Sequence, residues 1–224
     1  TDRPVAPMNY FAHALKFLDR PWFAASTGIP DWLTVCDRRV RMRTRHATPF
    51  LQDADPTVVA VAGGVIQHLE DDAWFHTTRT FAETSLAITV LARDALDGER
   101  GLRPSFLGHL LTEVLLDAVL IAQHPQELAR YYALLDQIDP QQIEAAVNQM
   151  APRPTTRLAA MIVGYRQARI LSDYAEDATL MVRLNQVMTR ARCDRLPDHF
   201  AQILPHARHL VTQRQEALLT PQPR

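Results

Sequence analysis

A segment near the middle of this 224-residue chain, roughly Pro104 to Ala122, is apolar almost all the way round a helix. Helices of this kind lie in protein interiors, where an isolated carboxylate is costly unless it is paired or binds a cation. Yet His109, Glu113 and Asp117 follow one another here at intervals of four residues. Because that spacing drifts only about 80° round a helix, the three side chains form one polar stripe. The sequence therefore predicts a buried helix whose stripe needs partners.

A second stripe has the same spacing and consists of His68, Asp72 and His76. We expect the two stripes to face each other with metal ions between them. A buried hydrogen-bond network without metal is the alternative. Residues eight apart on a helix are separated by about 12 Å, so His68 and His76 cannot share one small cation. The pattern thus favours two ions, about 3.5–4 Å apart, over a single structural zinc ion.

Two further potential ligands lie in the first forty residues. His13 is flanked by apolar positions of a predicted helix, and Asp31 follows a proline. Taken alone, such a histidine is more often a core residue and such an aspartate a helix cap or turn residue. With the stripes they complete the predicted metal ligands: His13, Asp31, His68, Asp72, His109 and Asp117. Imidazole and carboxylate without thiolate favour Mn, Fe, Mg or Zn.

Helical periodicity recurs in nearly every segment between proline or glycine breaks, and only 7 residues are glycine. We therefore predict an all-α fold and a single domain over residues 8–220. Its metal-site core is expected at about 8–122, with scaffold or substrate-wall helices at about 125–220. The expected helices are 9–18, 56–68 continuing through His76 to about 96, 104–122, 125–137, 140–150, 155–174, 178–191 and 197–219, with a loop or short helical turn over 21–36.

Composition excludes several classes of protein. The formal net charge is −1, so no overall field favours nucleic acid or an anionic membrane. No run of about 18 apolar residues occurs, and the first residues do not resemble a signal peptide. Cys36 and Cys193 are far apart and in no metal-type spacing. We expect a cytoplasmic protein with reduced thiols and no membrane span, although one long-range disulfide stays open.

One dense basic run follows Asp31 and consists of Arg38, Arg39, Arg41, Arg43, Arg45 and His46. Guanidinium groups bind phosphate in a forked geometry, so the run could gather a phosphorylated small molecule or an acidic carrier protein. A solvated segment with local ion pairs is the alternative. Nucleic acid is not expected, because aromatic residues near the run are lacking.

Three short patterns carry a resemblance to a known family: Met-Asn-x-x-Ala-His ending at His13, Gly28 shortly before Asp31, and Gly-x-x-x-His-x-x-x-Asp over Gly64, His68 and Asp72. Together they resemble the acyl carrier protein phosphodiesterase family, which is related to the HD-domain phosphohydrolases. A lesser likeness, through Pro30-Asp31 and the helical histidines, is to the zinc-dependent phospholipase C group. Both imply metal-dependent hydrolysis at phosphorus by a helical protein, and the first implies an HD-like phosphodiesterase or phosphatase.

Such chemistry suggests further roles for residues near the stripes. Metal-bound water is a ready nucleophile, so catalysis needs little beyond a base or proton donor, for which Glu113, His76 or Asp71 are candidates. For Asp71 the alternative is a solvated helix face. Trp74 could line a substrate cleft together with Arg38, Arg39 and Arg41, although an aromatic residue there is more often part of a core.

Two hypotheses from other classes remain. The first is a non-catalytic helical module with a structural metal site, which would be closed, whereas a catalytic site keeps an open position. The second is oxidation at a di-iron centre, against which the sequence offers no Glu-x-x-His motif.

Overall fold

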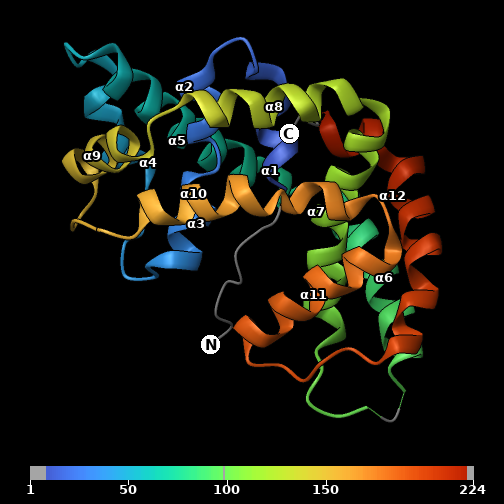
Figure 1. The fold of residues 1–224 in the computed structure, drawn as a ribbon. Coiled ribbons are helices and arrows are strands. Elements are labelled where there is room, and N and C mark those ends of the chain that lie inside the picture. The colour runs from blue at the N-terminus through green and yellow to red at the C-terminus, as the bar shows by residue number, and fades with distance from the viewer. Residues whose placement is uncertain (1–8, 98, 221–224) are drawn as a thin grey trace. The chain divides into compact units, whose positions relative to one another are not determined.

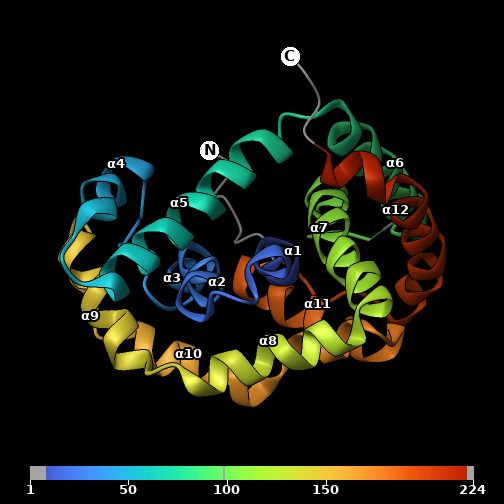
Figure 2. The ribbon, with the colours of Figure 1, turned by 90° about the horizontal axis from the view of Figure 1, so that it is seen from above.

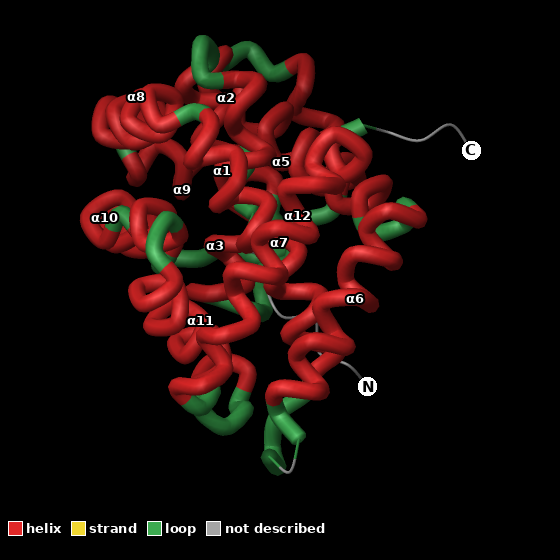
Figure 3. Tube along the Cα trace, turned by 90° about the vertical axis from the view of Figure 1, so that its right-hand side faces the viewer, coloured by secondary structure: helices red, strands yellow, loops and turns green. Residues whose placement is uncertain are grey.

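The computed structural model of the chain describes residues 9–97 and 99–220, and the regular elements in those residues are all helices (Figure 3). The predicted all-α class is therefore confirmed. Contacts divide the described residues into two compact units: Tyr10–Ala73 with His124–Arg169, and Trp74–Gln123 with residues 170–220. Met8, at the start of the predicted domain, lies outside the described residues. The single domain and the HD-like core stay predictions.

The first unit contains mostly short helices before one long helix. They are α1 (Tyr10–Ala14), α2 (Pro21–Ser26), α3 (Ile29–Cys36), α4 (Thr44–Ala47) and α5 (Pro56–Phe75), with 3-10 turns at Leu15–Phe17 and Thr48–Gln52, followed later in the chain by α8 (Pro125–Gln137), α9 (Pro140–Met150) and α10 (Leu158–Ala168). The last two residues of α5 belong to the second unit. Proline opens several of these helices, at a position where its missing N–H costs nothing.

An aromatic core fixes the first helices of this unit. The Tyr10 ring on α1 lies 4.9 Å from that of Tyr165 on α10, and Trp32 on α3 lies 5.2 Å from the same ring. All three side chains are buried, and large aromatic groups contribute much of the apolar area removed from water. Because His13 is three residues after Tyr10 and Asp31 precedes Trp32, this core determines where both polar side chains lie.

Gly64 permits a close contact between α2 and α5. A Cβ atom at this position would overlap the backbone oxygen of Phe23 and lie 2.7 Å from Cβ of Ser26. No larger residue fits there without moving a helix, since the obstacle includes backbone. Gly64 lies one turn before His68, so the contact helps to fix the position of that imidazole.

The second unit is built around α6 (Arg79–Ala95), α7 (Pro104–Gln123) and α12 (Leu204–Leu219), which lie side by side (Figures 1 and 2). It also contains α11 (Asp177–Ala191) and 3-10 turns at Ile170–Tyr174 and Asp198–Ile203. Every residue of α7 from Leu110 to Ile121 is buried. The prediction of a buried helix here is confirmed.

The length and hydropathy of α7 would also suffice for a membrane span, although most of the relevant window is buried within the protein. Core helices of soluble proteins meet the same criterion. This feature therefore leaves the cellular location undecided.

Four predicted helices are interrupted. The helix expected at 9–18 is α1 followed by the 3-10 turn that begins at Leu15. The helix expected to continue through His76 ends at Phe75, and α6 begins at Arg79 after the Thr78 side chain accepts a hydrogen bond from the Phe81 backbone N–H. The helix expected at 155–174 is α10 and a 3-10 turn, separated by Arg169 at φ 43°. The helix expected at 197–219 divides at Leu204.

Candidate metal centres

Five polar side chains of the first unit converge, and we call them the first cluster: His13, Asp31, His68, Asp71 and Asp72. His13 comes from α1, Asp31 from α3 and the other three from α5. His13, Asp31 and His68 are buried, whereas the side chains of Asp71 and Asp72 are 24% and 22% exposed. The cluster is therefore closed on one side and reaches solvent at the two carboxylates of α5.

The spacing of the inner atoms suits a metal ion better than a hydrogen-bond network. Nε2 of His68 lies 3.5 Å from Oδ2 of Asp72 and 3.7 Å from Oδ1 of Asp31, and Nε2 of His13 lies 3.5 Å from Oδ1 of Asp72. Good hydrogen bonds are about 2.7–3.2 Å long. Ligands at about 2.1 Å from a tetrahedral zinc ion lie about 3.4 Å from one another. The donor atoms thus have the separations of a metal coordination shell.

Asp71 holds the outer nitrogen of His13. Its Oδ2 lies 3.1 Å from Nδ1 of His13, and its Oδ1 accepts a hydrogen bond from Gln67. A carboxylate bonded to the remote nitrogen of a metal-binding histidine fixes the tautomer and increases its basicity. Asp71 therefore contacts His13 rather than only a solvated face, and its geometry favours a positioning role over that of a general base.

Burial and the neighbouring charges shift the pKa values of His13, His68 and Asp72 strongly. Burial alone would lower the pKa of His13, but the carboxylates of Asp71 and Asp72 outweigh burial and raise it to about 10. Burial and the neighbouring charge of His13 lower the pKa of His68. Burial alone would raise the pKa of Asp72, yet His13 and His68 hold it far below its usual range. Without metal, the protonated His13 supplies the positive charge.

Metal binding at this cluster is expected to strengthen as pH rises. With a pKa of about 10, His13 is protonated at neutral pH, and a metal ion must displace that proton from Nε2. The apparent affinity should therefore rise about tenfold per pH unit while one proton is released. Chelator competition between pH 6.5 and 8.5 measures this slope. Asp71→Asn should flatten it, since the pKa of His13 falls; an unchanged slope in that variant would contradict the assignment.

Three side chains of the second unit form the second cluster: His76, His109 and Glu113. His76 lies in the turn after α5, and the other two lie one turn apart on α7. Oε1 of Glu113 lies 2.6 Å from Nε2 of His76 and 3.2 Å from Nε2 of His109. Three potential ligand atoms, one from each residue, lie within 4.8 Å of one another. Burial alone would raise the pKa of Glu113, but the two histidines outweigh burial and lower it.

The structure corrects the predicted arrangement of ligands. His76 is not on the α5 helix with His68 and Asp72, so the predicted stripe of His68, Asp72 and His76 is wrong. Its imidazole instead contacts Glu113, and the ligand atoms form two groups rather than one continuous stripe pair. The Thr77-Thr78 pair is the signal that could have revealed the break, because threonine is a preferred N-cap. Asp117 is fully buried one turn after Glu113, and its role as a ligand stays a prediction.

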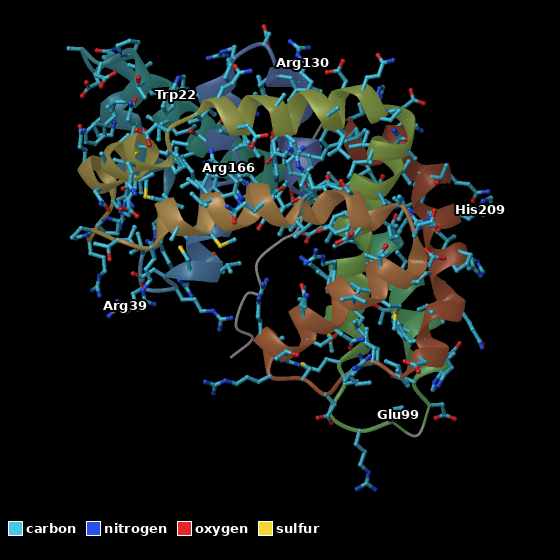
Figure 4. The ribbon with its side chains drawn as sticks, in the orientation of Figure 1. Trp22, Arg39, Glu99, Arg130, Arg166 and His209 are labelled. Carbon is cyan, nitrogen blue, oxygen red and sulfur yellow. The ribbon has the colours of Figure 1, made fainter. Side chains whose placement is uncertain are left out.

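The predicted substrate-binding residues are more exposed to solvent than His13, Asp31 and His68 of the first cluster. Arg38, Arg39 and Arg41 are exposed, and Arg39 points away from the ribbon (Figure 4). Nε of Arg39 pairs with Asp37 at 3.2 Å, as expected of a solvated segment with local ion pairs. Trp74 is half-buried, with its ring edge-on to Phe75. Substrate binding by these four residues stays a prediction.

Comparisons with protein-family models, curated proteins and solved structures found no match to this chain.

Proposed function

We propose that the first cluster binds a divalent metal ion and hydrolyses a phosphoester. One observation carries this proposal: Nε2 of His13 and Oδ1 of Asp72 are buried, lie 3.5 Å apart and have no hydrogen-bond partner among the described residues. Buried polar atoms without partners are costly and rare. A cation bound by both atoms, with His68 and Asp31, would satisfy them.

Each residue then has a defined task. His13, His68, Asp31 and Asp72 would hold the ion, and Asp71 would keep His13 in the tautomer that offers Nε2. A divalent ion so placed supplies a water of lowered pKa and neutralises charge at the phosphoryl group. The partly exposed carboxylates of Asp71 and Asp72 mark the side from which substrate would enter.

The proposed substrate is a phosphodiester, either small or linked to a carrier protein. The motifs around His13, Asp31 and His68 support this class through their likeness to acyl carrier protein phosphodiesterases. The exposed Arg38, Arg39 and Arg41 begin two residues after α3, which carries Asp31. In a chain of net charge −1 they provide a local positive surface for a phosphate or an acidic partner.

A structural metal site is the second candidate, favoured by the nearly complete burial of His13, Asp31 and His68. The two functions differ in whether the ion keeps a coordination position that water or substrate can occupy. Cobalt-substituted His109→Ala, which lacks a ligand of the second cluster, distinguishes them, because phosphate added to an open first cluster changes the visible absorption. An unchanged spectrum and no hydrolysis would favour the structural site.

Protein purified without chelator is expected to contain divalent metal, and His68→Ala should lose the part that is bound at the first cluster. With Mn²⁺, Fe²⁺ or Zn²⁺ it should hydrolyse the chromogenic diester bis(4-nitrophenyl) phosphate. Elemental analysis and initial rates provide the measurements, and circular dichroism shows whether the variant keeps its helices. Wild-type protein that binds no metal after reconstitution would overturn the proposal.

A further inference from the structure

The second cluster joins two segments of the second unit through a single carboxylate. His76 follows α5 in a turn, whereas His109 and Glu113 belong to α7. The two imidazole rings are 4.9 Å apart and each contacts the ring of Phe81 at 4.9 Å. Apolar packing therefore holds both histidines with their Nε2 atoms directed at the same oxygen.

The two histidines can satisfy only one of the two carboxylate oxygens of Glu113. Both Nε2 atoms address Oε1 of Glu113, while its Oε2 is buried and has no hydrogen-bond partner among the described residues. A buried carboxylate needs donors or a cation at both oxygens, because an unsatisfied buried oxygen costs about 1–3 kcal/mol. The side chain is 1% exposed, so solvent does not supply the missing donor.

We propose that His76, His109 and Glu113 bind one divalent transition-metal ion, in a site that shares no ligand with the first cluster. One potential ligand atom from each of the three residues lies within 4.8 Å of the other two, so a single ion can reach all three. Two imidazoles with one carboxylate, and no thiolate, select zinc and its neighbours over calcium or magnesium.

The exposure of the histidines indicates how the ion would be reached. The side chains of His109 and His76 are 44% and 27% exposed, in contrast to the fully buried Glu113. The ion would enter from the histidine side, and water would complete its coordination there. Bound in this way, it ties the turn after α5 to α7 and stabilises the second unit. This inference does not depend on the proposed hydrolysis, because none of its ligands belongs to the first cluster.

The test is zinc content after reconstitution and removal of loosely bound metal by gel filtration. We expect two equivalents in wild-type protein, one in His109→Ala, one in His68→Ala and none in the double variant. His209→Ala serves as a control, since His209 is exposed on α12 and points away from the ribbon in Figure 4. That variant should keep two equivalents.

Cobalt provides a second readout that does not require activity. Cobalt-loaded His68→Ala should retain visible d–d absorption, and adding His76→Gln should remove it. If circular dichroism shows that His109→Ala misfolds, the test rests on comparing His68→Ala with and without His76→Gln. His76 lies in a turn outside α7, so its substitution leaves that helix unchanged. Unchanged zinc content in both His109→Ala and His76→Gln would overturn this site. Loss of metal in His68→Ala alone would still support the first cluster.

Discussion

Asp72→Asn is expected to reduce metal-dependent phosphodiester hydrolysis by about a thousandfold, because a metal ion contributes several kcal/mol of transition-state stabilisation and each 1.36 kcal/mol is tenfold in rate. Asp72 contacts both histidines of the first cluster, at 3.5 Å in each case. Asparagine keeps the shape but removes the charge, so the ion is held less tightly and the charge balance with His13 is lost. Saturation curves in metal and in bis(4-nitrophenyl) phosphate separate weaker metal binding from slower chemistry.

Glu70→Gln is the matched control for this prediction. Glu70 lies two residues earlier on α5 and faces solvent, so the same change of charge occurs outside the cluster. Its rate and metal content should match those of wild-type protein. If Asp72→Asn keeps both the wild-type rate and the wild-type metal content, Asp72 is not a ligand and the proposed centre is wrong.

Gly64→Ala is expected to destabilise the protein by about 1–3 kcal/mol, the usual range for an added methyl group in a filled interior. The new Cβ would overlap the backbone oxygen of Phe23 and approach Ser26 Cβ to 2.7 Å, so α2 and α5 must separate. Urea denaturation measures the loss of stability. Because His68 lies one turn further along α5, metal affinity should fall as well.

Gly164→Ala is the matched control, because it makes the same substitution in a helix at a position without a close contact. Nothing lies within 4 Å of a Cβ atom at Gly164 in α10, and the position is exposed. There alanine should stabilise the protein by up to about 1 kcal/mol, through higher helix propensity. Equal effects of the two substitutions would show that the α2–α5 contact is unimportant. An equivalent close contact exists at Gly108, whose Cβ would overlap the Ser85 backbone oxygen of α6.

Local sequence patterns predicted most of the helices correctly. The proline-initiated helices α7, α8 and α9 begin where expected, since proline at the first helical position requires no long-range information. The interruptions at Leu15, His76–Thr78, Arg169 and Leu204 were missed. Helical periodicity continues across each break. A threonine cap begins a new helix at Thr78 and a left-handed residue ends α10 at Arg169, whereas an α-helix and a 3-10 turn adjoin directly at Leu15 and at Leu204.

Four of the predicted ligands, His13, His68, Asp72 and His109, lie in groups that could hold a metal ion, but the grouping was not predicted. Spacing shows which side chains share a helix face, as it does for His68 with Asp72 and for His109 with Glu113. It carries no information on which faces meet. His76 lies in a turn and contacts Glu113, whereas His68 and Asp72 meet His13 and Asp31.

The sequence by itself determined the all-helical class, the burial of α7 and the residue types available for metal binding. These follow from hydrophobic periodicity and from the chemistry of imidazole and carboxylate, which are local properties. The tertiary structure decided that Asp71 holds His13, and that the ligand atoms form two groups. Such contacts join residues up to 58 positions apart, and they depend on how aromatic cores and close glycine contacts position whole helices.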